Sequence, residues 1–202
     1  MFLTANVSYS KEINTKLMNK VIVIDPGHGG KDAGTSVGGI YEKDINLSIA
    51  LLLRDELIRN GATVILTRDD DYDLSSPNID RRKKSDFDNR IKLINNSDVD
   101  LYLSIHINFL GNSKYYGAQV FYTKGNELLA NVMQQSFNSY LKSPMDEKEV
   151  GESIYMYDKL NPPGLLLECG FLSNSREKNL LVTKSYQEKI VNAIVKALLN
   201  YY

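Results

Sequence analysis

The chain contains few of the residues that cross-link a small protein or anchor it in a membrane. Among its 202 residues there is one cysteine, so a disulfide within the chain is impossible. No segment approaches the roughly 20 consecutive apolar residues of a membrane-spanning helix. The first 18 residues are mostly polar and lack the apolar core of a signal peptide. We therefore expect no stable membrane span in this chain.

The chain also lacks an excess of positive or negative charge, because its formal net charge is -1. Proteins that bind nucleic acid usually carry a strong positive excess, so nucleic acid is not expected as a partner. The remaining composition, 43% hydrophobic and 24% charged, is typical of a globular protein with a sizeable core. There is no internal repeat. We expect one domain over residues 20–202, preceded by an N-terminal extension over residues 1–19.

The spacing of apolar residues changes repeatedly between the pattern of a buried strand and that of a helix. This alternation predicts an α/β protein with a largely parallel sheet and helices on both faces. Residues 68–89 carry both charge signs and Pro77, which favours a solvated surface loop. Strands are predicted at 21–24, 62–68, 100–108, 117–123 and 164–169, and helices at 42–59, 90–97, 128–141 and from about residue 185.

Histidine is scarce as well, and the two histidines occupy comparable places. His28 follows the first predicted strand and His106 closes the third, while Glu168 closes the last. Glu42 begins the helix after the first strand. In a parallel α/β sheet the carboxyl ends of the strands meet at one edge, where ligands bind. We therefore expect these four side chains, which are distant in the sequence, to meet.

Two imidazoles and a carboxylate are a ligand set that suits zinc, which keeps a fourth position for water in catalytic sites. This chemistry predicts His28, Glu42 and His106 as metal ligands. The glycines on both sides of His28 would let the backbone turn sharply off the strand. Glu168 is then the general base that takes a proton from water and passes it to the leaving amine.

Structural interpretations of the same residues stay open at this point. A lone histidine is usually structural or on the surface, Asp25 can simply cap a loop, and Cys169 can be a small buried hydrophobe. Glu168 follows three leucines, so its carboxylate is expected to be desolvated and to need a partner or a function. The local zinc motif H-E-x-x-H is absent. Spacing alone does not decide between a zinc site and these alternatives.

Three motifs, together with Glu42, resemble the zinc-dependent N-acetylmuramoyl-L-alanine amidases of the type-3 amidase family. They are DPGHGGKDAG (25–34), SIHIN (104–108) and LLLECGFLSN (165–174), and they occur in the order found in that family. The resemblance implies a twisted, mostly parallel sheet of about six strands. It also implies the same three zinc ligands, Glu168 as the catalytic glutamate, and hydrolysis of the amide between N-acetylmuramic acid and L-alanine in peptidoglycan.

Within that family, the stretch 81–108 is most similar to the spore-cortex branch, the CwlD-type amidases of endospore formers. That branch removes peptides from muramic acid so that muramic-δ-lactam can form. The resemblance implies an exported protein on the cell-wall side of the membrane, in the forespore intermembrane space, with a role that extends to germination. Asn108 and Arg90 lie in the matching motifs and are predicted to contact substrate.

Two departures from the family pattern bear on control of activity. Ala33 stands where proline is usual, which should change only the stiffness of the loop. Only six residues separate Leu110 from the strand that starts at Gly117, so the inhibitory insertion of some members is missing. We therefore expect an accessory protein that aids zinc binding or activity. Two functions remain as alternatives to amidase activity: a zinc peptidase that cuts stem peptides, and an inactive wall-binding module.

Overall fold

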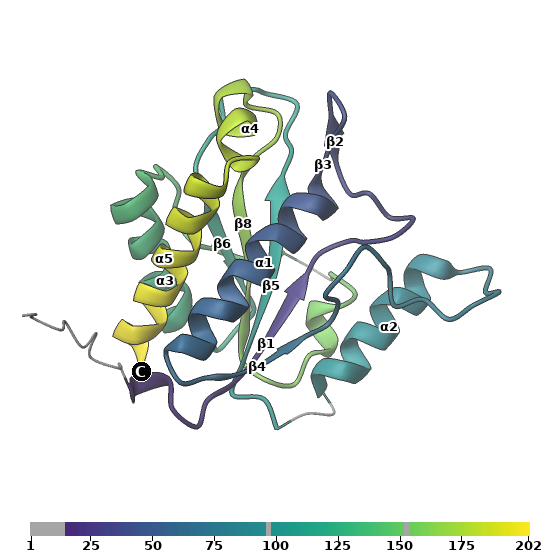
Figure 1. Cartoon of the computed structure of the whole chain (residues 1–202), viewed down its shortest axis with the longest axis horizontal. Helices are drawn as coiled ribbons and strands as arrows, with labels where there is room; N and C mark the ends of the chain where they lie inside the picture. The colour runs from purple at the N-terminus through teal and green to yellow at the C-terminus, as the bar shows by residue number, and fades with distance from the viewer. Residues whose placement is uncertain (1–14, 96–97, 152–153) are drawn as a thin grey trace, which may run out of the picture.

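The protein is built around one six-stranded sheet. The computed structural model describes residues 15–95, 98–151 and 154–202 (Figure 1). The strands of the sheet are β1 (Val21–Pro26), β4 (Thr63–Leu66), β5 (Leu101–Asn108), β6 (Gln119–Tyr122), β7 (Lys148–Glu149) and β8 (Gly164–Phe171). Their order across the sheet is β4-β1-β5-β8-β6-β7, so β1, β5 and β8 lie in its interior.

Helices connect most of these strands, and a small hairpin precedes the first helix. The hairpin is formed by β2 (Ser36–Val37) and β3 (Ile40–Tyr41). The helices are α1 (Glu42–Arg59), α2 (Arg82–Asn95), α3 (Glu127–Leu141), α4 (Ser175–Leu181) and α5 (Lys184–Tyr201), with short 3-10 helices η1 (Thr15–Leu17) and η2 (Tyr157–Lys159). No helix among the described residues is long and apolar enough to cross a bilayer.

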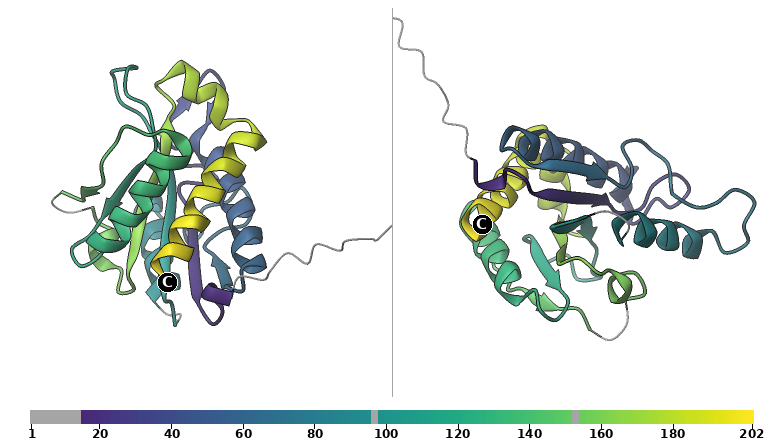
Figure 2. Two further views of the ribbon diagram at one scale, coloured as in Figure 1. Left: turned by 90° about the vertical axis from the view of Figure 1, so that its left-hand side faces the viewer. Right: turned by 90° about the horizontal axis from the view of Figure 1, so that it is seen from below.

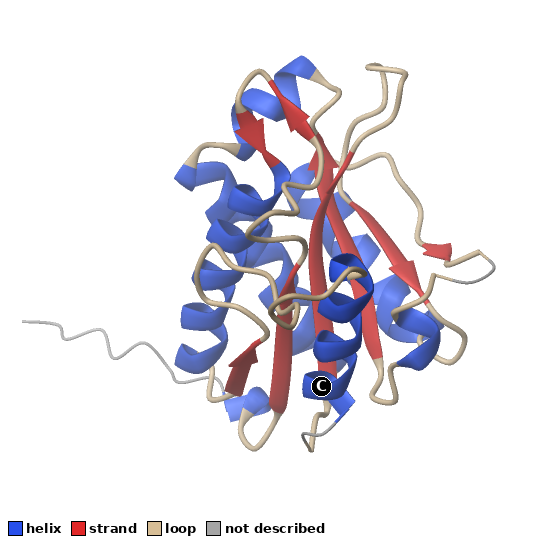
Figure 3. Ribbon diagram, turned by 90° about the vertical axis from the view of Figure 1, so that its right-hand side faces the viewer, coloured by secondary structure: helices blue, strands red, loops and turns tan. Residues whose placement is uncertain are grey.

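The direction of the strands confirms the predicted fold class. Strands β4, β1, β5 and β8 run parallel to one another. Strand β6 runs antiparallel to β8, and β7 runs parallel to β6. The long central strands twist against one another, as Figure 3 shows in red. The protein therefore has the mostly parallel, twisted sheet that the sequence predicted, with two reversed strands, β6 and β7, at one edge.

Each central strand buries both of its faces. Ile22 and Ile24 of β1 belong to the larger core cluster, which α1, α3 and α5 complete. Val23, between them, points to the opposite face and packs with Tyr102 and residues of α2. Such burial on both faces explains the continuous apolar run of β1. Helices thus cover both faces of the sheet, as predicted (Figure 2).

The segment 68–89 differs from its prediction. Helix α2 begins at Arg82, eight residues before the predicted start, so residues 82–89 are not a surface loop. Arg68 and Asp86 are buried. The end of the predicted helix, residues 96–97, lies outside the described residues. Residues 1–14 of the predicted extension lie there too, while Leu17 is fully buried in the core.

Candidate active site

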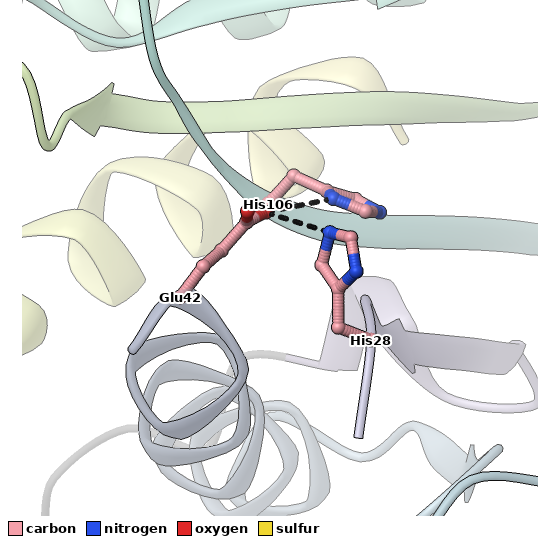
Figure 4. A group of neighbouring side chains, drawn as sticks. All are labelled: His28, Glu42 and His106. Carbon is pink, nitrogen blue, oxygen red and sulfur yellow. Dashed lines mark hydrogen bonds and ion pairs between the residues drawn. The ribbon is translucent and has the colours of Figure 1, made fainter. Parts of the chain in front are cut away.

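The four residues predicted to meet lie together at the carboxyl edge of the sheet. His28 follows β1, His106 lies near the end of β5, and Glu42 is the first residue of α1. His106 and Glu168 are register partners on the adjacent strands β5 and β8. One ligand atom from each of His28, Glu42 and His106 lies within 4.8 Å of the others (Figure 4). The prediction that the chain brings these residues together is confirmed.

Glu42 is the common partner of the two imidazoles. Its Oε1 lies 3.2 Å from His28 Nε2 and 3.0 Å from His106 Nδ1. The rings meet edge to face, with centroids 5.1 Å apart. In Figure 4 both rings turn toward the carboxylate of Glu42. Two nitrogen donors and one oxygen donor therefore face one point.

The backbone around Glu42 fixes the direction of its carboxylate. The amide of Thr35 donates to Oε2 at 2.9 Å, and the amide of Ile107 donates to Oε1 at 3.2 Å. The β2–β3 hairpin leads directly into α1 and turns on Gly38 and Gly39, both of which have positive φ. The glycines of this junction thus form a defined two-residue turn.

His28 is held by a second carboxylate. Its Nδ1 lies 3.1 Å from Asp32 Oδ2, so Nε2 is the nitrogen that faces Glu42. Histidines that bind metals commonly donate their other ring nitrogen to a carboxylate, which orients the ring. Burial works against protonation of His28, but the hydrogen bonds to Asp32 and Glu42 outweigh it and raise the pKa of His28 to about 9. Asp32 was not singled out in the sequence, although its position four residues after His28 was a usable signal.

Glycines make room for the side chains of the candidate ligands, as the sequence predicted for this loop. A Cβ atom on Gly27 would lie 2.2 Å from His106 Cε1. One on Gly34 would lie 2.6 Å from Glu42 Oε2 and 2.7 Å from His28 Cδ2. His28 itself has a φ of 62°, a left-handed conformation that is rare for a residue with a side chain. Rare backbone conformations of this kind cluster at functional sites.

Glu168 has surroundings that differ from those of Glu42. Its Oε2 is buried and has no hydrogen-bond partner among the described residues. Desolvation, followed by the charge of Glu42, raises the pKa of Glu168 to about 8. For Glu42, burial acts in the same direction, but the hydrogen bonds and charges of His106 and His28 hold its pKa well below the usual range. Without a cation nearby, Glu168 thus holds a proton at neutral pH, and a carboxyl with a pKa raised in this way at a cavity is a candidate for proton exchange.

Two cavities meet at these side chains. One, of about 220 Å³, is lined by His28, His106 and Glu168 together with apolar groups such as Phe87 and Met156. The other, of about 390 Å³, is lined by the same three residues and by Glu42, Asn108 and Lys83. Glu168 and both histidines therefore line both cavities.

The donor set fits a divalent cation. Two imidazole nitrogens and one carboxylate oxygen within 4.8 Å are the composition of a catalytic zinc site with three protein ligands. Glu168 lines the same cavities, and the negative charge of its ionised form would be poorly compensated there, because its Oε2 has no hydrogen-bond partner among the described residues. A bound cation would compensate this charge, and a carboxylate beside it can serve as a base in hydrolysis.

The two predicted substrate contacts have different environments. Asn108 lines the second cavity. Arg90 lines the first cavity but is only 1% exposed, and its guanidinium donates to Asp25, Asp86 and the carbonyls of Pro26 and His28. Substrate contact by either residue stays a prediction.

Comparisons with known proteins agree with this site. A family model described as N-acetylmuramoyl-L-alanine amidase matches residues 22–200. The germination-specific N-acetylmuramoyl-L-alanine amidase of Bacillus subtilis (strain 168) is 40% identical over 192 residues, covering 92% of this chain and 81% of that protein. An amidase of Clostridium difficile 630 superposes with a TM-score of 0.78 at 32% identity, covering 90% of this chain and 96% of the other.

The structural comparison also bears on the subfamily. The CwlD amidase of Clostridioides difficile, solved in complex with the GerS lipoprotein, has a TM-score of 0.85 and 38% identity to this chain. The match covers 91% of this chain and all of the other. The predicted resemblance to CwlD-type amidases is thus confirmed. With nearly the whole chain matched by one family model, this protein belongs to the N-acetylmuramoyl-L-alanine amidases, the hydrolases that cleave peptidoglycan between muramic acid and L-alanine.

Proposed function

We propose that His28, Glu42 and His106 hold a zinc ion and that Glu168 is the general base of amide hydrolysis. The observation that carries this proposal is the convergence of two nitrogen donors and one oxygen donor within 4.8 Å, at cavities that Glu168 also lines. Zinc suits this mixed donor set better than calcium or magnesium, which prefer oxygen ligands alone.

The chemistry assigned to Glu168 follows from its position and its missing partner. Zinc, when bound, supplies a polarised carbonyl and a water with a lowered pKa. Glu168 takes one proton from the attacking water while the water oxygen bonds to the lactyl carbonyl carbon. It then returns that proton to the nitrogen of L-alanine as the C–N bond breaks. The products are the free carboxylate of muramic acid and a stem peptide with a free N-terminus.

The biological setting that we propose is maturation of the spore cortex, in which loss of the stem peptide permits formation of muramic-δ-lactam. The germination-specific amidase of Bacillus subtilis and the CwlD amidase of Clostridioides difficile support this role. The protein would then act outside the cytoplasm, on the cell-wall side of the membrane and in the forespore intermembrane space.

We also propose an accessory lipoprotein that raises zinc occupancy. The support is that the CwlD relative was solved in complex with a lipoprotein. The loop that carries His28 has several residues with positive φ, and ordering such a loop has an entropic cost that lowers metal affinity. A partner that binds the metal-loaded form offsets that cost by linkage. Titrating zinc into the chelated protein, with and without the candidate lipoprotein, tests this.

The catalytic proposal is tested by digesting purified cortex-type peptidoglycan and analysing the products by mass spectrometry. Intact stem peptides that begin with L-alanine are expected, and they should disappear with the Glu168→Gln variant as the matched control. Shortened stems would show a peptidase instead. Binding to the glycan without any released product would show a wall-binding module.

A further inference from the structure

Arg68 is a buried charge whose direct hydrogen-bond partners are all uncharged backbone carbonyls. It follows β4 and is 1% exposed. No carboxylate lies within ion-pair distance of its guanidinium among the residues that the structure describes. Burying a guanidinium is costly unless its surroundings satisfy it, so this placement needs an explanation.

The hydrogen bonds of Arg68 go to backbone carbonyls around the His28 loop. Nε donates to Pro26 at 3.0 Å, and Nη2 donates to Gly27 at 3.0 Å and to Lys43, in the first turn of α1, at 2.8 Å. Nη1 donates to Asp70 at 3.1 Å. The guanidinium therefore joins the segment before His28 to the helix that begins with Glu42.

Arg90 completes this arrangement from α2. Its Nη1 donates to the carbonyl of Pro26 at 2.9 Å, and its Nη2 donates to that of His28 at 2.6 Å. Three consecutive carbonyls, from Pro26 to His28, thus accept hydrogen bonds from two buried guanidiniums. Unlike Arg68, Arg90 has carboxylate partners, Asp25 and Asp86.

The loop has a conformation that needs such support. His28, Gly29 and Gly30 have φ values of 62°, 133° and 54°, three left-handed residues in succession. A Cβ atom on Gly29 would lie 2.9 Å from both Cδ and Nε of Arg68, so the side chain of Arg68 packs directly against the turn. Rare conformations persist only where the surroundings determine them.

We propose that Arg68 is a positioning residue of the metal centre: it fixes the turn that aims His28 at Glu42 and His106. The inference rests on the proposed metal site and deepens it. Among the described residues, Arg68 makes no hydrogen bond or ion pair to any of the three ligand side chains, and it acts through the backbone carbonyls of Pro26, Gly27 and Lys43. Replacing Arg68 keeps all three metal ligands in the chain but lets the distances between their donor atoms vary.

The test measures zinc affinity, by competition with a chromophoric chelator, in the metal-free full-length protein carrying Arg68→Met or Arg68→Lys. Supporting groups behind metal ligands typically contribute about 10- to 100-fold in affinity, and we expect a loss of that size for Arg68→Met. Arg68→Lys keeps the charge but not the planar set of donors, so it should restore only part of the affinity. Circular dichroism confirms the fold, and Arg68→Lys decides the matter if Arg68→Met does not fold.

Gln134→Leu is the matched control, because Gln134 is a buried polar residue that bonds Val120 and Ala118 on another part of the sheet. It should lower thermal stability without changing zinc affinity more than about twofold, within the scatter expected for distant sites. Zinc affinity within twofold of wild type in both Arg68 variants would overturn the positioning role and leave the metal site standing. A wild-type protein that does not bind zinc would overturn both proposals.

Discussion

The surroundings of the two glutamates at the site shift their pKa values in opposite directions. Glu42 accepts hydrogen bonds from two backbone amides and faces two imidazoles. The imidazoles hold its pKa low and keep it ionised, as the proposed ligand role requires. Glu168 is desolvated and lies near the charge of Glu42, which raises its pKa to about 8. A pair of carboxylates separated in this way commonly divides into one charged group and one group that exchanges protons.

The Glu168→Gln variant separates these two roles. The amide has nearly the same shape, so the fold and zinc content should be retained. It cannot accept a proton, so turnover should fall by about two to four orders of magnitude, the usual contribution of general acid–base catalysis. Turnover of muropeptides and metal analysis on the same sample check both points. A variant that loses its zinc would show that Glu168 is a ligand.

The charge state of His28 predicts how zinc binding depends on pH. Its pKa is raised from 6.5 to about 9, so the proton stabilises the metal-free fold below pH 6.5, and this stabilisation is lost as the pH rises through 9. Zinc must displace that proton, and its affinity should fall about tenfold from pH 8 to pH 7.

Calorimetry in two buffers of different ionisation enthalpy measures the proton released on zinc binding. The Glu168→Gln variant is the better sample, because it removes the second group that titrates in this range. Release of close to one proton at pH 7 is expected, and zinc binding without proton release would contradict the prediction.

The sequence identified the site residues that follow strands but not those that support them. His28, His106 and Glu168 could be found because the ends of parallel strands converge. Asp32 lies beside His28, and Arg68, the proposed positioning residue, bonds the carbonyls before it; both contacts depend on the path of the loop, which no local pattern encodes. Arg68 was predicted where a strand meets a solvated loop, because the following segment carries both charge signs and Pro77, whereas the structure buries it.

At the scale of elements, α2 shows where apolar periodicity gives no signal. Its buried residues are Ser85, Asp86, Arg90 and Ile94, so most of its inner face is polar. The ion pairs of Arg90 with Asp25 and Asp86 satisfy part of these groups. Asp86 and Ser85 also accept hydrogen bonds from the backbone amides of residues 74 and 76. Because the first half of α2 lacks apolar residues at helical spacing, the sequence predicted a loop there and a helix only from residue 90 onward.

Helix α4 was absent from the sequence prediction, although a signal for it existed. Asn174 is its N-cap and accepts from the amides of Arg176 and Glu177. Asn followed three residues later by Glu is close to the capping-box pattern. The buried Glu177 instead accepts from the amides of Phe171 and Gly117, and so it fixes the end of β8 near Glu168.

Removing this cap has a predictable cost. Asn174→Ala should lower the free energy of unfolding by about 1 kcal/mol, the typical value for a lost N-cap. Denaturant unfolding of the metal-free protein measures it. Ser175→Ala, at an exposed neighbouring position, is the control and should stay within about 0.5 kcal/mol of wild type. Equal effects of the two substitutions would contradict a capping role for Asn174.

For the whole molecule, the sequence predicted the class of fold but not the arrangement of the strands. Long apolar runs such as Leu165–Leu167 indicate interior strands, and the structure places β8 beside β5 accordingly. The reversal of β6 and its pairing with β8 depend on contacts between residues more than 40 positions apart. Pairing between strands so far apart in the sequence depends on the packing of the whole domain, which the local spacing of apolar residues does not reveal.

Metal binding should stabilise the whole domain. When only the folded state binds zinc, a zinc concentration of about 100 times the dissociation constant raises the free energy of unfolding by about 2.7 kcal/mol. For a chain of this size, each kcal/mol corresponds to a shift of about 2–4 °C in the unfolding midpoint, so a rise of about 5–11 °C is expected. Differential scanning calorimetry measures it, and His28→Ala should show no rise. A similar rise in that variant would place the zinc elsewhere.

Both histidines of the chain lie in one site, 5.1 Å apart. A sample labelled with ¹⁵N in histidine alone, and expressed without a histidine tag, therefore gives imidazole resonances from the active site and from nowhere else in the molecule. The nitrogen shifts distinguish the protonated ring, each neutral tautomer and the metal-bound ring. A few histidine resonances can thus report proton loss, metal binding and substrate binding at the site, in a protein without any substitution or attached probe.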